Sequence, residues 1–320
     1  MASVSFWRRT PPALFPATLG AIGLALGWRG ASETLGAPSL IADILLLMAG
    51  VVFAVIFVSY IAKLIARPSA VLQDMTPAPA RAAVSAGSMC LMVLAANLVA
   101  VGITGLAEGL WLIGLTLHVI YMLCMIWVLK GLPKPERAVT PVLFLPFVGY
   151  IVSPFAGPAL GYETLSFWVF MYTLAAGAVI LVLAVPPFFL KETPAPARPA
   201  AAITLAPMSV AAISSDALGM TMFAVVFGLI NIPVALLMLA KARWLTAAGF
   251  SPTWGAFTFP AASFAGLMVM FARYWGGVWD AVAWATLTAA AGIVLPIWLR
   301  TLWMWSQGAL APATGAGIAR

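Results

Sequence analysis

Apolar runs of about 20 residues recur along the whole chain, and they restrict its fold more than any other feature. A helix of roughly that length crosses the ~30 Å hydrocarbon core of a bilayer. Only 8% of the residues are charged, whereas a soluble domain carries about 25%. A transmembrane β-barrel alternates apolar and polar residues, but segments such as 44–60 are apolar all round. Because backbone groups in lipid must bond to one another, we predict an all-α integral membrane protein.

We predict that residues 1–320 form a single transmembrane domain with ten spans. The first apolar run follows two arginines and resembles a signal peptide, but three prolines interrupt it, so we interpret it as a span. The longest polar stretches, Ala66–Arg81 and Lys191–Ala200, are predicted to be loops. The predicted spans cover residues 13–28, 39–62, 82–104, 109–129, 138–158, 164–190, 200–215, 217–240, 253–272 and 281–299.

The basic residues indicate the orientation of these spans, because cytoplasmic loops of membrane proteins are enriched in lysine and arginine. If both ends are cytoplasmic, 14 of the 16 basic residues lie on that side, and Arg29 and Arg273 lie outside. We therefore predict an N-in/C-in, multi-pass protein, and the alanine-rich composition with short loops favours a cell (inner) membrane. The cytoplasmic set is Arg8, Arg9, Lys63, Arg67, Arg81, Lys130, Lys134, Arg137, Lys191, Arg198, Lys241, Arg243, Arg300 and Arg320.

Several classes of function are disfavoured by composition. The net charge of +7 is spread singly over short loops and forms no basic patch, so we expect no nucleic-acid partner. Cys90 and Cys124 lie inside apolar runs, and His118 is the single histidine, so neither a metal site nor a haem is predicted. The spans contain no catalytic motif, and we expect neither an enzyme nor a cofactor. His118 is either a packing residue that forms a hydrogen bond or a candidate for proton coupling.

The odd-numbered spans share a pattern that indicates a repeat of helical hairpins. Four of them carry a proline near the predicted cytoplasmic end, namely Pro16, Pro146, Pro207 and Pro260. The third span has Gly87 there instead. Proline kinks a helix and frees a carbonyl group, and a bilayer tolerates freed backbone where protein or water satisfies it. Five kinked helices therefore suit the wall of a central pore, although proline is also frequent in transmembrane helices generally.

The residues predicted to line such a pore are uncharged. Small and hydroxyl side chains on the odd spans include Thr18, Gly20, Ser85, Ser88 and Ser209. A pore without buried acids disfavours cations and is permissive for anions.

The ninth span opens with the most distinctive segment of the chain, in which Phe257 and Phe259 flank Thr258. An aromatic ring in a narrow uncharged pore can gate it by excluding water. Ordinary packing of these aromatic rings between helices is the alternative interpretation.

The chain resembles the tellurite-resistance/dicarboxylate transporter family, which includes the bacterial protein TehA and the plant guard-cell slow anion channels. The resemblance covers about residues 8–305 and rests on the ten-span plan and on four short motifs. These motifs are Phe15-Pro16-x-x-x-Gly20-x-x-Gly23-Leu24, Pro141-x-x-x-Leu145-Pro146, Leu205-Ala206-Pro207 and Trp254-x-x-Phe257-Thr258-Phe259-Pro260.

The resemblance implies five helical hairpins around a central pore, a homotrimer in membrane lipid, and occlusion of the pore by Phe259. The third span departs from the pattern because it lacks a proline. The leading hypothesis is an anion channel, or a channel-like pathway, for small inorganic or organic anions. The alternative is a secondary transporter or exporter of dicarboxylate, sulfite or tellurite, coupled to protons through His118.

Overall fold

In the computed structural model, which describes residues 5–133, 137–190 and 192–318, helices account for all the regular secondary structure. Three of the basic residues used to predict orientation, Lys134, Lys191 and Arg320, lie outside the described residues. By length and composition, eight helices of the described chain are apolar enough to cross a membrane. The protein is therefore a multi-pass, α-helical membrane protein.

Five of the eight apolar helices carry large apolar side chains on their exposed faces, as a lipid environment requires. Only 22% of the most apolar window is buried in α7 and in α9. Leu47 and Val58 of α2 and Trp168 of α7 are examples of exposed side chains. These outer helices are α2 (Ser39–Ala66), α5 (Thr104–Gly131), α7 (Glu163–Leu190), α9 (Thr221–Ala240) and α12 (Val278–Ser306).

The inner segments are far more buried: 78% of the apolar window of α4 and 72% of that of the segment containing α11 lie inside the protein. They contact one another in a closed cycle, in which α1 packs on α4, α4 on η4, η4 on α8, α8 on α11, and α11 on α1. We call this cycle the inner ring. Its members are α1 (Leu14–Thr34), α4 (Ala78–Ala100), η3–α6–η4 (Pro141–Leu143, Phe144–Val148, Gly149–Phe155), η6–α8 (Ala195–Thr204, Leu205–Ala217) and η7–α11 (Pro252–Trp254, Gly255–Trp275).

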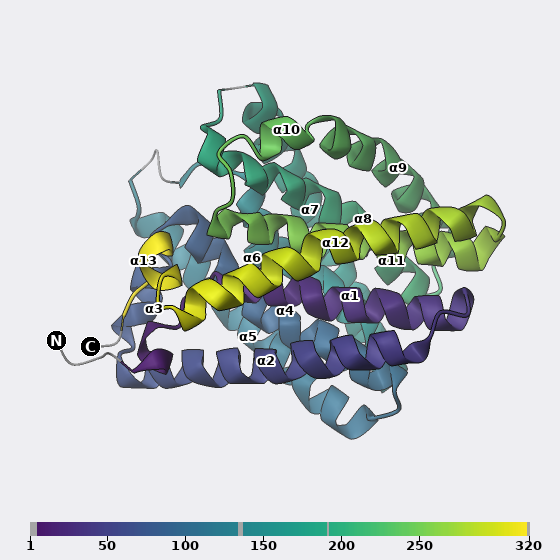
Figure 1. Cartoon of the computed structure of the whole chain (residues 1–320), viewed down its shortest axis with the longest axis horizontal. Helices are drawn as coiled ribbons and strands as arrows, with labels where there is room; N and C mark the ends of the chain where they lie inside the picture. The colour runs from purple at the N-terminus through teal and green to yellow at the C-terminus, as the bar shows by residue number, and fades with distance from the viewer. Residues whose placement is uncertain (1–4, 134–136, 191, 319–320) are drawn as a thin grey trace.

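Each member of the inner ring also packs against the outer helix that follows it in the chain. The pairs are α1 with α2, α4 with α5, η4 with α7, α8 with α9, and α11 with α12. Figure 1 shows α1, α2 and α12 running along the long axis of the molecule, with α3 (Ser69–Asp74) and α13 (Leu310–Thr314) at one end. The remaining short elements are η1 (Phe6–Arg9), η5 (Pro158–Leu160) and α10 (Ala242–Leu245).

Two of the ten predicted spans, 13–28 and 138–158, are not among the eight apolar helices. The first corresponds to α1, whose four glycines and Arg29 reduce its apolar character. The second corresponds to Pro141–Phe155, a shorter apolar segment that is mostly 3₁₀-helical. Pro141, Pro146 and Pro154 remove N–H donors from this segment, so a continuous α-helical ladder cannot form.

The two predicted loops were wrong in part. Residues 69–74 of the first form α3, and residues 195–200 of the second belong to η6, which extends the predicted 200–215 span toward its N-terminus. Alanine is the best helix former, and proline is tolerated in the first turn of a helix, where its missing N–H has no partner anyway. The prediction had counted the alanines as well as the prolines of these stretches in favour of a loop, although alanine favours a helix.

Candidate functional site

Two cavities lie inside the inner ring, one toward each end of the molecule. The proximal cavity, about 500 Å³, lies at the end where η1 and α13 are found, and it is lined by residues of all five ring members. The distal cavity, about 700 Å³, lies at the opposite end and also touches all five. Among the described outer helices, α2, α5 and α9 contribute no residue to either cavity.

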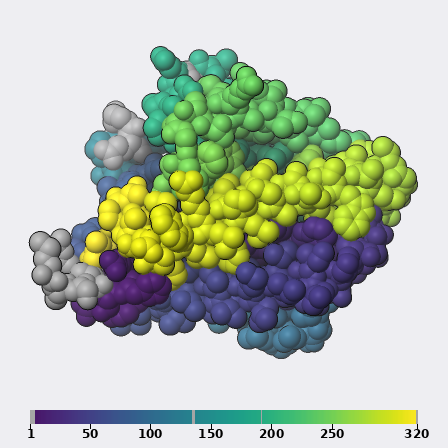
Figure 2. All heavy atoms as spheres, viewed as in Figure 1, coloured from purple at the N-terminus to yellow at the C-terminus, as the bar shows by residue number. Residues whose placement is uncertain are grey.

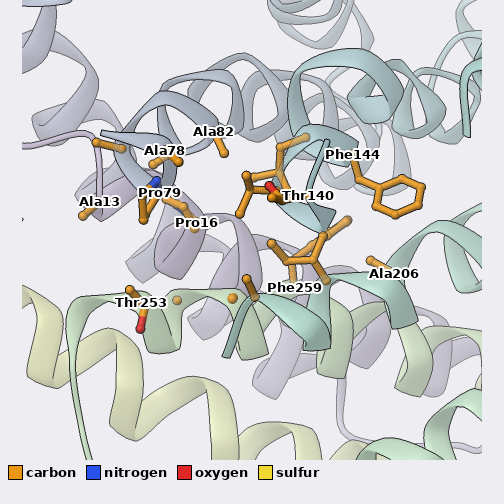
Figure 3. A pocket seen from close by; sticks show the side chains of 18 of the residues that line it. Ala13, Pro16, Ala78, Pro79, Ala82, Thr140, Phe144, Ala206, Thr253 and Phe259 are labelled. Atoms are coloured by element: carbon orange, nitrogen blue, oxygen red, sulfur yellow. The ribbon is translucent and has the colours of Figure 1, made fainter. Parts of the chain in front are cut away.

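The proximal cavity is apolar and uncharged along the described part of the chain. Its walls are alkyl and aromatic side chains such as Leu19, Phe144 and Ala206, and Figure 3 shows several of them from close by. The polar side chains that line it are the hydroxyl groups of Thr140, Ser251, Thr253 and Thr314. An uncharged cavity of this kind offers nothing that would bind an ion tightly.

The distal cavity carries charges of both signs. Arg29 and Arg273 line it together with Glu33, Asp216 and Asp280. Both arginines form ion pairs, Arg29 with Asp43 of α2 and Arg273 with Asp216 of α8. These are the two basic residues that the sequence places outside the cytoplasmic set, and the structure brings both to one cavity.

Phe259 is the one described residue that lines both cavities. It lies on α11, and its side chain is buried to all but 7%. Its ring packs against Gly23 of α1, where a β-carbon would lie 3.1 Å from Cδ2 of the ring. The ring of Phe259 therefore stands between the two cavities.

A tight seam between α1 and α11 holds Phe259 in this place. A β-carbon on Gly20 would lie 2.8 Å from the carbonyl carbon of Thr258, so only glycine fits there. The hydroxyl of Thr258 lies 2.9 Å from the carbonyl oxygen of Pro16 on α1 and 2.8 Å from that of Gly255. Small residues permit such close approach of helices in membranes, where dispersion and hydrogen bonds replace the hydrophobic effect.

The predicted pore-lining residues divide into two groups. Pro16, Pro207, Pro260 and Phe259 line the proximal cavity. The others line neither cavity, and these are Thr18, Gly20, Ser85, Gly87, Ser88, Pro146, Ser209, Thr258 and Phe257.

The hydroxyl residues of the second group are satisfied inside the protein. Thr18 donates to the carbonyl oxygen of Leu14, and Ser85 donates to that of Ala82. Ser209 donates to the carbonyl oxygen of Leu205 and accepts from Asn231 of α9. A helical serine or threonine can bond to the carbonyl three or four residues earlier, so a hydroxyl on an inner helix does not imply contact with water.

Phe257 lies on a different face of α11 from Phe259. Its ring packs edge-on against Trp254, with 5.6 Å between the ring centroids. It also packs on a small buried cluster made of Ala201, Met238 and Leu245.

His118 is fully buried behind the wall of the proximal cavity. Its Nδ1 lies 2.8 Å from Oγ of Ser88, and its ring packs edge-on against Tyr150 with 4.3 Å between centroids. Gly149 lines the cavity and separates it from His118, since a β-carbon on Gly149 would lie 2.8 Å from Nε2 of His118.

A buried ion pair near the proximal cavity was missed by the sequence analysis. Lys63 of α2 and Asp74 of α3 lie 2.7 Å apart, and both side chains have no exposed surface. Asp74 is the one acid in a segment flanked by Arg67 and Arg81, and this isolation was the available signal. It was overlooked because the segment was predicted to be a solvated loop.

A comparison with protein families finds one match for this chain. The family model described as SLAC1, voltage-dependent anion channel, matches residues 9–305. No curated protein matches the chain. The matched residues contain all five members of the inner ring, their outer partners apart from the last residue of α12, and the distal cavity. They also contain every residue that lines the proximal cavity except Ala313 and Thr314.

Proposed function

The chain belongs to the voltage-dependent anion channel family, and from this premise we propose that it conducts small inorganic or organic anions along the axis of the inner ring. The observation that carries the proposal is the position of Phe259, which lines both cavities. In this proposal the two cavities are the two halves of one pore, and the ring of Phe259 closes it.

The proposed pore requires ten crossings of a cell (inner) membrane, with both ends in the cytoplasm. The closed ring and its five outer partners support ten crossings, because α1 and Pro141–Phe155 occupy the same place in the cycle as the longer members. The 21 residues of α1 correspond to ~32 Å of helix, enough to cross the hydrocarbon core. On this topology the proximal cavity opens to the cytoplasm. The homotrimer implied by the resemblance is part of the same proposal.

The physical basis of gating is the exclusion of water from a narrow apolar constriction. Leu19, Val210 and Ala256 line the proximal cavity along with Phe259, and their side chains cannot hydrogen-bond an ion's hydration shell. An anion therefore meets a dehydration barrier at the ring of Phe259, and turning or shortening that side chain lowers the barrier.

The alternative, a proton-coupled transporter, requires a titratable side chain that meets the transported anion. The proximal cavity has none among the described residues that line it. His118, the one candidate from the sequence, lies behind Gly149 and lines neither cavity. These positions favour passive conduction over coupling through His118.

The test is the anion conductance of purified protein in planar bilayers, with Phe259→Ala compared against wild type. We expect a closed wild type and a large, weakly selective anion current in the variant, with a reversal potential near that of chloride in a potassium chloride gradient. Phe257→Ala is the matched control, because it removes an equal ring two residues away that lines neither cavity.

The two variants together separate a gate from general damage to α11. A current in Phe259→Ala but not in Phe257→Ala supports the gate. Equal currents in both would show that loss of packing alone opens a leak, and no current in either folded variant would overturn the proposal. A homotrimer is tested separately by the mass of the detergent-solubilised protein.

A further inference from the structure

The segment Gly308–Ile318, called here the C-terminal segment, forms part of the wall of the proximal cavity. It contains α13, and two of its residues, Ala313 and Thr314, line that cavity. The segment leaves α12 through Gly308, which has a φ of +71° that glycine adopts readily. Figure 2 shows these C-terminal atoms (yellow) gathered beside the N-terminal ones (dark purple) at one end of the molecule.

Two sides of the cavity wall are joined by the C-terminal segment. On one side, α13 packs against η7, of which Pro252 and Thr253 line the cavity. On the other side, Gly315 lies next to Pro77, another lining residue. A β-carbon on Gly315 would lie 4.0 Å from Cγ of Pro77. The segment therefore bridges two parts of the cavity wall, η7 and the residues that precede α4.

The buried pair Lys63–Asp74 fixes the far end of this segment. Asp74 accepts a hydrogen bond from the backbone N–H of Gly317 at 2.7 Å through Oδ1. Its other oxygen, Oδ2, accepts from Lys63 and, at 2.9 Å, from the hydroxyl of Tyr60. Lys63 also donates to the carbonyl oxygens of Thr10 at 2.8 Å and Gly317 at 3.3 Å.

Stability alone does not explain this pair. A buried ion pair contributes little net stability, because the desolvation of two charges offsets their attraction. Apart from the bond with the hydroxyl of Tyr60, the hydrogen bonds that remain after pairing go to the backbone of Thr10 and of the C-terminal segment. Arg67, on the same helix end, donates to the carbonyl oxygen of Ile318. The charges are thus placed where they hold the C-terminal segment.

We propose that the C-terminal segment is a lid on the proximal cavity and that Lys63 and Asp74 are the positioning residues that keep it closed. Its effect on anion entry rests on the function proposed above, whereas the closure itself does not. Release of Gly317 from Asp74 frees Ala313 and Thr314 from the cavity wall and widens the opening.

The test measures how fast a thiol inside each cavity reacts with a negatively charged methanethiosulfonate in detergent-solubilised protein. The background is Cys124→Ser, since Cys124 is exposed and Cys90 is buried. Ala206→Cys reports on the proximal cavity and Ala100→Cys on the distal one. This readout needs no current, so it is independent of whether the protein conducts anions.

The key substitution is Gly317→Pro, which removes the N–H that bonds to Asp74 and changes neither side chain of the buried ion pair. A β-carbon at this position would also lie 3.1 Å from the carbonyl oxygen of Ala70, which disfavours the closed position further. A hydrogen bond to a charged group is worth about a tenfold change or more in an equilibrium. We therefore expect the thiol of Ala206→Cys to react about tenfold faster with Gly317→Pro than without it. The thiol of Ala100→Cys should react at an unchanged rate.

Asp74→Asn is the second variant, with Asp216→Asn as its matched control at the distal end, where an aspartate is also ion-paired. Asp74→Asn should accelerate the proximal thiol and Asp216→Asn should not. An unchanged proximal rate in folded Gly317→Pro overturns the lid. Equal acceleration of both reporters also overturns it, because it indicates general loosening. A lid confirmed by these rates, with no current from Phe259→Ala, would refute the channel and keep the lid.

Discussion

The proximal and distal cavities are built from the same five segments, yet they differ in charge. Described residues lining the proximal cavity carry hydroxyl groups as their most polar side chains. Those lining the distal cavity include two arginines and three acids. The two meet at Phe259, so in the proposed pore a charged vestibule ends at an apolar throat.

In the proposed pore, this difference assigns the effect of charge on an ion to one cavity and the removal of its hydration water to the other. Charges at a wide, wet vestibule act on ions that keep their hydration shells, and salt screens them over about 10 Å at 0.1 M. An uncharged throat acts on ions that lose water, and there size and hydration set the barrier. The acids outnumber the arginines in the distal cavity, and Arg29 and Arg273 are both paired. We therefore expect weak anion selectivity from the vestibule and a strong barrier from the throat.

The largest effect is expected from placing a charge in the uncharged cavity. Ala206→Glu, made in the conducting Phe259→Ala background, puts a carboxylate against passing anions. We expect anion current at pH 8 to fall by about tenfold or more, because Coulomb repulsion is strong where little water screens it. Ala206→Gln has nearly the same shape and should retain most of the current. Equal currents in the two variants would show that the cavity is not on the conduction path.

A smaller effect, on stability, is expected at the seam that keeps the two cavities apart. Gly20→Ala places a β-carbon 2.8 Å from the Thr258 carbonyl carbon, so α1 and α11 must separate. Overpacking of this kind costs about 1–3 kcal/mol, and thermal unfolding in detergent should shift to a lower temperature. Gly30→Ala, on the same helix, meets Val269 at an ordinary 3.4 Å and is the control. Equal melting temperatures for the two variants would contradict the tight seam.

The smallest effect is expected at the distal cavity. Arg273→Gln removes a positive charge that is 52% exposed. In the Phe259→Ala background it should lower anion current about twofold at low salt, and the loss should vanish near 1 M salt, where the Debye length is about 3 Å. Asp280→Asn should raise current at low salt by a similar factor. A loss that persists at high salt would place Arg273 in the throat instead of the vestibule.

Hydrophobic runs predicted most of the fold because lipid allows few solutions. All of the predicted even spans correspond to long helices, such as α5 for 109–129 and α12 for 281–299. The prediction was weakest where proline and glycine are dense, at Pro141–Phe155 and in η6. There the local sequence disfavours a regular helix, and the surrounding ring determines the backbone path instead.

The candidate site was predicted unevenly, for a reason that concerns helix faces. Proline at 16, 207 and 260 marks three members of the inner ring, and these residues line the proximal cavity. Pro16 and Pro207 lie in the first turns of α1 and α8, where proline does not interrupt a helix, and Pro260 lies inside α11. Hydroxyl groups were a poor guide, because Ser85 and Thr258 bond to backbone carbonyls within the protein. The ion pair of Arg273 with Asp216 joins residues 57 positions apart in the chain, and no local pattern predicts such a meeting. Lys63 and Asp74 are only 11 positions apart, and their pair was missed because the segment around Asp74 was predicted to be a loop.

The sequence by itself determined the membrane environment, the helical class, the family and the proline-bearing segments that recur among the inner helices. These follow from composition and from short-range patterns, since a lipid solvent demands internally bonded helices. The tertiary structure alone decided which face of each inner helix lines a cavity, and that Phe259, the phenylalanine to which the resemblance points, lines two separate cavities. Thirteen of the 21 residues of α11 are buried, so burial does not show which of them meet a cavity. The packing of Phe259 against Gly23 of α1 is what sets its ring between the two cavities.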